Sequence, residues 1–252
     1  MGEWVVHVDA INRSTILQFT NELFLPFYEA TVLARIWRAW LRLRFLLFQR
    51  HRFNRLVLER VGDYSLLILP DVFNPTLFLT SEFMVEAFDS SLIPPGSSVL
   101  DMGTGSGIGA IFAARWAGRV LAVDVNPAAV RCARINVLLN DLEAKIVVRE
   151  GDLFAGLAER RFAVILFNPP YFPGEPTGAL DRAFHATDVA ERFAAGLGAH
   201  LVPGGWALVL LSSLGDEAGF LAALAARGWA AKGVAQRRLP SERITLYRVA
   251  RA

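Results

Sequence analysis

The sequence predicts an α/β protein whose core is a doubly wound parallel sheet, and three observations support this fold class. The apolar run Ser97–Asp101 leads through a glycine-rich turn into the helical pattern Ile108–Trp116, which is the opening unit of such sheets. Strand-like and helix-like segments alternate downstream, which favours parallel strands joined by right-handed crossovers. The last two strand-like segments are separated only by Leu239-Pro240-Ser241, and so short a connection permits only an antiparallel pair. We therefore expect a Rossmann-like, seven-stranded doubly wound sheet with one antiparallel strand.

The hydrophobic pattern and the end signals place the individual elements. Strands are expected at Ser97–Asp101, Arg119–Asp124, Lys145–Arg149, Phe162–Phe167, Trp206–Leu211, Trp229–Arg238 and Glu242–Ala250. Helices are expected at Ile108–Trp116, Pro127–Leu139, Asp188–Leu201 and Glu217–Arg227. The helix at Pro127–Leu139 has the clearest start, because Asn126 can cap it and proline suits the first helical position.

Upstream of this domain, the sequence predicts a basic N-terminal extension with a helix and a β-hairpin. The pattern from Phe27 to Leu41 is that of an amphipathic helix, and eight arginines accompany one acid, Glu59, between Thr31 and Arg60. Three interpretations of this segment stay open: a helix packed on the domain with solvated arginines, a face that contacts RNA or a ribosomal substrate, and a helix on a membrane surface.

The hairpin and the next helix have local signals of their own. Asn54–Arg60 and Tyr64–Leu69 are strand-like and flank a Gly-Asp turn signal, and Thr80 or Ser81 is expected to cap a helix over Glu82–Phe88. We assign residues 1–75 to the N-terminal basic helix and hairpin extension, a candidate substrate-recognition region. Residues 76–252 form the main domain.

Composition excludes several classes of protein. The net charge is +2, hydrophobic residues make up 54% and the mean hydropathy is +0.37, yet no uncharged apolar run is long enough to span a membrane. The single Cys132 excludes an internal disulfide and, with no signal peptide evident, suits the cytoplasm. The histidines lack metal-ligand spacing, so we expect no metal site. The sequence gives no indication of the oligomeric state.

Two acids near the glycine turn indicate its ligand. Asp101 lies at the start of the turn, where it would repel a diphosphate and attract an ammonium group. Asp124 ends the next apolar run, nineteen residues after Gly105, which is the spacing of a carboxylate that binds ribose hydroxyls. Together they favour S-adenosylmethionine over NAD. Two alternatives stay open: an NAD(P) oxidoreductase, because Gly105-x-Gly107-x-x-Ala110 also fits a nucleotide fingerprint, and a non-catalytic binding module.

The fourth strand ends in Asn168-Pro169-Pro170-Tyr171, at the same sheet edge as both acids. Asn168 offers a side-chain carbonyl, and Pro169 offers a main-chain carbonyl without a competing N–H. Two fixed acceptors can hold both hydrogens of a planar –NH2 group, and Tyr171 adds a flat stacking surface. This motif predicts methyl transfer to a planar nitrogen, driven mainly by in-line positioning.

Four motifs in this order resemble class I S-adenosylmethionine-dependent methyltransferases, most of all the HemK/PrmC group, which methylates a glutamine side-chain amide in peptide-chain release factors. The motifs are Asp101-x-Gly103-x-Gly105-x-Gly107, Val123-Asp-Val-Asn-Pro127, Gly151-Asp-Leu-Phe-Ala-Gly-Leu157 and Asn168-Pro-Pro-Tyr171. The resemblance implies that the cofactor-binding residues are Ser81, Asp101, Gly103, Gly105, Gly107, Asp124, Val125, Asp152, Leu153 and Asn168. It assigns the acceptor nitrogen to Asn168, Pro169, Pro170 and Tyr171.

The chain departs from this group before the glycine turn. Ser81 stands where the group has a threonine that touches the cofactor, a nearby arginine is missing, and residues 1–60 do not match the group's N-terminal helical domain. The expected macromolecular substrate is therefore a release factor-like protein or, alternatively, RNA or DNA methylated on adenine N6 or guanine N2, where a base is flipped out.

Overall fold

The computed structural model describes residues 55–77, 79–170, 188–240 and 242–252, together with Trp40 and Leu43. Most of the expected N-terminal helix and arginine-rich segment lies outside the described residues, as does Tyr171. The chain divides into two compact units, residues 1–50 and 51–252. Within the described residues, no helix is both long and apolar enough to cross a membrane.

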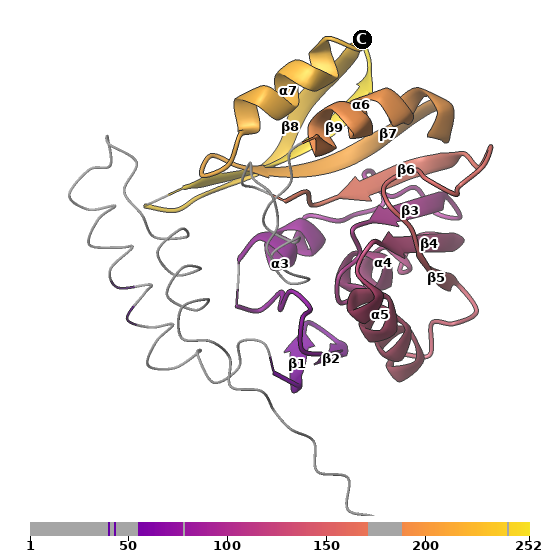
Figure 1. Cartoon of the computed structure of the whole chain (residues 1–252), viewed down its shortest axis with the longest axis vertical. Coiled ribbons are helices and arrows are strands. Elements are labelled where there is room, and N and C mark those ends of the chain that lie inside the picture. The colour runs from indigo at the N-terminus through magenta and orange to yellow at the C-terminus, as the bar shows by residue number, and fades with distance from the viewer. Residues whose placement is uncertain (1–39, 41–42, 44–54, 78, 171–187, 241) are drawn as a thin grey trace, which may run out of the picture. The chain divides into compact units, whose positions relative to one another are not determined.

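The second unit contains a seven-stranded sheet with the spatial order β5-β4-β3-β6-β7-β9-β8 (Figure 1). Its strands are β3 (Ser98–Met102), β4 (Arg119–Asp124), β5 (Ile146–Glu150), β6 (Phe162–Phe167), β7 (Leu201–Ser212), β8 (Trp229–Arg238) and β9 (Arg243–Arg251). Strands β3 to β7 pair in parallel, whereas β9 runs antiparallel to both β7 and β8. One reversed strand in a seven-stranded sheet confirms the expected fold class.

Helices cover both faces of this sheet, which therefore carries two apolar cores. The helices are α3 (Leu79–Glu86), α4 (Ile108–Ala113), α5 (Pro127–Leu139), α6 (Val189–His200) and α7 (Glu217–Ala225). Val99 belongs to the core beneath α3, α4 and α5, and the next residue, Leu100, belongs to the core beneath α6 and α7. This alternation follows from the two-residue period of a strand. Because β3 runs parallel to β4 and to β6, the loops after these three strands lie at one edge of the sheet.

The predicted hairpin forms from β1 (Val57–Val61) and β2 (Tyr64–Ile68), and two asparagines of α5 hold it. Asn136 accepts a hydrogen bond from Leu67 N at 2.6 Å and donates to Leu67 O at 3.0 Å. Asn140 bonds Ser65 in the same way, at 3.2 and 2.9 Å, so the two amides continue the pairing of β2. Asn136 also donates to Ser106 O at 2.8 Å. The hairpin, α5 and the glycine turn are therefore tied together.

Several element boundaries differ from the expectation by one or more residues, and two of the differences have a local explanation. Helix α3 begins at Leu79, so Thr80 and Ser81 lie inside its first turn and do not cap it. A turn precedes the helix, and in it Asn74 Oδ1 accepts from Thr76 N at 3.0 Å. The helix follows this turn and therefore begins earlier than the capping residues suggested. Strand β7 begins at Leu201, before the predicted Trp206, because the Pro-Gly-Gly segment between them forms a bulge opposite β6.

Candidate active site

The glycine turn after β3 has a backbone that other residues would strain. Gly103, Gly105 and Gly107 have φ values of +65°, +56° and +87°, which L side chains rarely adopt. A Cβ on Gly107 would lie 3.2 Å from Ala133, and one on Gly105 would meet no heavy atom within 4 Å. The turn therefore packs against α5 at Gly107 and opens onto free space at Gly105.

Asp101 holds the turn together from inside. Its side chain is buried, and its Oδ2 atom accepts from Thr104 Oγ1 at 2.6 Å and from Ala110 N at 2.8 Å. A Cβ on Gly109 would lie 2.7 Å from Asp101 Oδ1, so the helix can approach the carboxylate only at a glycine. Burial raises the pKa of Asp101 to about 6, because desolvation disfavours the charged form.

Because the pKa of Asp101 is raised, the free energy of unfolding should depend on pH. Above pH 6 the folded protein bears the cost of a buried charge, and the cost is recovered as the pH falls, since Asp101 takes up its proton in the folded state first. Compared with Asp101→Asn, which does not titrate, the wild-type protein should gain about 2 kcal/mol of unfolding free energy between about pH 7 and pH 4. Urea unfolding of both proteins without cofactor measures this difference. A difference that stays constant with pH would contradict the assignment.

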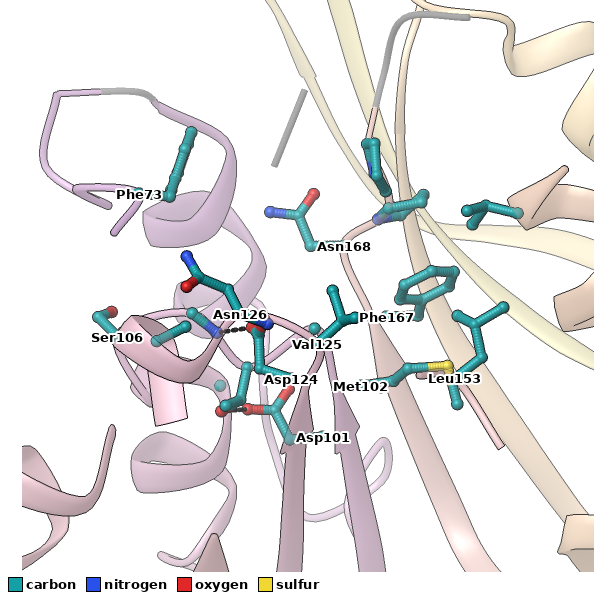
Figure 2. A pocket seen from close by; sticks show the side chains of 18 of the residues that line it. Phe73, Asp101, Met102, Ser106, Asp124, Val125, Asn126, Leu153, Phe167 and Asn168 are labelled. Atoms are coloured by element: carbon teal, nitrogen blue, oxygen red, sulfur yellow. Dashed lines mark hydrogen bonds between the residues drawn. The ribbon is translucent and has the colours of Figure 1, made fainter. Parts of the chain in front are cut away.

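Asp124, at the end of β4, closes the turn from the next strand. Its Oδ2 atom accepts from Gly105 N at 2.8 Å and its Oδ1 atom accepts from Asn126 N at 2.9 Å. Burial raises the pKa of this carboxyl group, although the backbone bonds oppose the shift. Each carboxylate oxygen has two lone-pair sites, so both can also accept from a ribose hydroxyl. Figure 2 displays Asp101 and Asp124 side by side at the base of the cavity.

The loop after β5 supplies another wall. Leu153 lines the cavity with a φ of +51°, a conformation that is strained for leucine and often retained at functional sites. Asp152 also lines it, and its Oδ2 atom accepts from Arg192 Nη2 at 2.7 Å. With this left-handed backbone at Leu153, the neighbouring residues Asp152 and Leu153 both line the cavity.

Asn168 follows β6 at the level where the glycine turn follows β3, because Met102 pairs with Phe167. Its Nδ2 atom donates to Ser81 Oγ at 3.2 Å, which directs Oδ1 away from α3. Figure 2 shows the Asn168 side chain projecting into the cavity above the two carboxylates. Pro169 and Pro170 line the same cavity. Asn168, Pro169 and Pro170 therefore lie beside the glycine turn, as the parallel pairing of β3 and β6 requires.

The linker between β2 and α3 forms a wall that the sequence did not predict. Asp71, Val72 and Phe73 line the cavity, and Asn126 Nδ2 donates to Asp71 O at 2.8 Å. The capping asparagine thus joins the linker to the start of α5. Its Asn-Pro signal predicted the cap, but nothing in the sequence indicated the second contact.

These walls enclose a cavity of about 420 Å³, within the range of small-molecule sites. Eleven of the expected site residues line it, namely Ser81, Asp101, Gly103, Gly105, Asp124, Val125, Asp152, Leu153, Asn168, Pro169 and Pro170. Gly107 instead begins α4. Further lining residues that the sequence missed include Asp188 and Arg192.

The charges around the cavity fit a cationic cofactor. The described lining residues include five aspartates and one basic side chain, Arg192, which is already bonded to an aspartate. Such a wall favours the sulfonium and ammonium groups of S-adenosylmethionine and disfavours a diphosphate. We propose, as the resemblance implies, that Asp101 and the glycines hold the methionine part, Asp124 the ribose, and Asp152 with Leu153 the adenine.

The fold and the cavity define a class I S-adenosylmethionine-dependent methyltransferase. Residues 63–224 match the methyltransferase small domain family, and the chain belongs to that family. Relatives named release factor glutamine methyltransferase confirm the resemblance to the HemK/PrmC group; that of Geobacter sulfurreducens is 32% identical over 133 residues, 47% of this chain and 46% of the relative.

Two further comparisons cover more of the chain. A provisionally named protein N5-glutamine methyltransferase of Methanocaldococcus jannaschii is 28% identical over 193 residues, 73% of this chain and 94% of the relative. The structure of the Thermus thermophilus 16S rRNA N2 G1207 methyltransferase, solved with S-adenosylmethionine and guanosine, superposes with a TM-score of 0.59 at 25% identity over 77% of this chain and 50% of that one. The chain spans 26% to 53% of the length of the bacterial relatives named L11 and release factor methyltransferases.

Proposed function

We propose that this protein methylates the side-chain amide nitrogen of a glutamine in a protein of the translation apparatus. The observation that carries this proposal is the position of Asn168, whose amide is held by Ser81 beside the glycine turn. Support also comes from the M. jannaschii relative, whose name specifies N5-glutamine and which the chain matches over nearly its whole length.

The chemistry follows from the acceptors at this corner. The Asn168 carbonyl and the main-chain carbonyl of Pro169 can accept both hydrogens of a planar –NH2 group, which orients the nitrogen toward the cofactor. Bound S-adenosylmethionine supplies an electrophilic methyl group. Transfer of that methyl group would release S-adenosylhomocysteine, and the methylated nitrogen would release a proton to solvent. No strong base is needed, because the nitrogen becomes acidic as it gains positive charge, and alignment accounts for most of the acceleration.

A second candidate substrate is the exocyclic amine of a base in RNA. The T. thermophilus rRNA methyltransferase that this chain resembles was solved with guanosine, and guanine N2 is also a planar –NH2 group. The same two carbonyls would fit it. We propose that the arginine-rich residues 1–75 contribute to recognising the macromolecule, and that the protein acts in the cytoplasm, where translation factors are found.

The experiment that tests the proposed function is transfer of tritiated methyl from S-adenosylmethionine to purified release factors, ribosomal proteins and rRNA. We expect label on protein, with mass spectrometry locating the methyl group on a glutamine side chain. The Asn168→Ala variant is the control, since it should lose this label. Label confined to a base of rRNA would overturn the glutamine assignment and support the second candidate.

A further inference from the structure

Arg192, on α6, is the one basic side chain among the described residues that line the cavity. Its Nη2 atom donates to Asp152 Oδ2 at 2.7 Å, and its Nη1 atom lies 3.7 Å from Asp188 Oδ1. The bond to Asp152 raises the pKa of Arg192, so the guanidinium stays charged. One cation thus lies between two carboxylates of the cavity wall.

Stability does not account for this arrangement. The side chains of Arg192 and Asp152 are 41% and 50% exposed, and ion pairs this exposed contribute little to folding because water screens them. Both residues instead face the cavity at the loop expected to hold the adenine. The position of the pair therefore points to a role toward the bound ligand.

Helix α6 is packed so that it holds Arg192 next to this loop. Its Phe193 stacks on Phe154, the residue after Leu153, with ring centroids 5.8 Å apart, and on Phe167 at 4.6 Å. The Phe154 ring lies so close to Gly196 that a Cβ there would overlap it. The helix that carries Arg192 is therefore docked directly on the loop that carries Asp152.

The hydrogen bond from Arg192 determines how the Asp152 carboxylate is presented to a ligand. Arg192 engages Oδ2 and so restricts rotation of the Asp152 carboxylate, whose oxygens only accept hydrogen bonds. This carboxylate would accept from the exocyclic amine of adenine and repel the carbonyl that hypoxanthine has at the same position. Without Arg192 the carboxylate would rotate freely and would lie near the like charge of Asp188.

We propose that Arg192 is a positioning residue that fixes the Asp152 carboxylate and so makes the cofactor site select adenine over bases that carry a carbonyl at the same position. The proposal deepens the proposed function, since it rests on the cofactor and on the adenine role of Asp152. It does not depend on which macromolecule accepts the methyl group.

Calorimetric titration of the full chain with two ligands tests this proposal. S-adenosylhomocysteine and S-inosylhomocysteine carry the same charges and differ only at one edge of the base, which has a 6-amine and an unprotonated N1 in adenine and a 6-carbonyl and an N1–H in hypoxanthine. The wild-type protein should prefer the adenine compound by about 10-fold or more, and Arg192→Gln should bind it about 5-fold more weakly and lose most of the preference. Arg192→Lys, which keeps the charge, should retain part of the preference.

Glu191→Gln is the matched control, because Glu191 is exposed on the same helix and does not line the cavity; it should bind both ligands like the wild type. Equal weakening of both ligands by Arg192→Gln would overturn the proposal and indicate a general charge effect. An unchanged preference would overturn it too. Failure of the wild type to bind S-adenosylhomocysteine would refute the cofactor site itself, whereas binding with no methylated glutamine would refute only the proposed substrate.

Discussion

Replacing Asn168 with alanine is expected to slow methyl transfer by about 100- to 1,000-fold, the usual effect of removing one positioned hydrogen-bonding group from an active site. The substitution removes the side-chain carbonyl that orients the acceptor nitrogen. Cofactor affinity should change by less than about threefold, because Asn168 is only one of ten expected cofactor-binding residues and the contacts to the methionine, ribose and adenine parts are assigned to the others. Initial rates at saturating S-adenosylmethionine, together with calorimetry of cofactor binding, measure both quantities.

Variants of Asn168 and Ser81 distinguish the orientation of the Asn168 amide from simple loss of its side chain. Asn168→Asp keeps an acceptor oxygen at this position and should retain more activity than Asn168→Ala. Ser81→Ala removes the hydroxyl that holds the Asn168 amide, so it should lower the rate by about 10-fold, and Ser81→Thr should restore it. Loss of cofactor affinity equal to the loss of rate in Asn168→Ala would count against the assigned role.

The elements of the sheet could be predicted closely because their signals are local. Strands β4 and β6 and helix α5 have the bounds that the sequence predicted. For α5 the reason is visible, since Asn126 accepts from Ala128 N at 2.9 Å and Pro127 occupies the first helical position. Strands covered on both faces are continuous apolar runs, which a sequence displays directly.

Most of the residues that line the cavity could be predicted because the strands that carry them run parallel in the sheet. Asp101 lies one residue before the end of β3, Asp124 ends β4 and Asn168 follows β6. Neighbouring parallel strands place their carboxyl ends at one edge. The role of Asp101 could not be foreseen in the same way. Its Oδ2 atom is used by Thr104 and Ala110 within the turn, because a buried carboxylate must first satisfy its own hydrogen bonds.

The remaining walls depend on contacts between distant segments. Arg192 reaches Asp152 across 40 positions of the chain, and Ser81 reaches Asn168 across 87. Ser81 does so because α3 begins earlier than its capping signals suggested. A single sequence contains no record of such pairs, since neither residue changes the local hydrophobic period or a turn signal.

Replacing Asp124 with alanine is expected to weaken S-adenosylmethionine binding by about 100-fold or more, since the ribose loses its charged acceptor and each such bond is worth about 1.5–3 kcal/mol. The effect should exceed that of the ribose contacts alone. Gly105 N and Asn126 N both donate to this carboxylate, so its removal also frees the glycine turn that cradles the methionine part.

Asp124→Asn serves as the matched variant, because it keeps the side-chain volume and one acceptor oxygen but turns an amide donor toward one of the two backbone N–H groups. Its affinity should fall between those of the wild type and Asp124→Ala. Calorimetry gives the affinities, and thermal unfolding of each variant without cofactor shows whether the sheet is intact. Unchanged affinity in a folded Asp124→Ala protein would mean that the ribose is bound elsewhere. Asp101, whose carboxylate already accepts from Thr104 and Ala110, would then be the remaining acid of the two that indicated the cofactor.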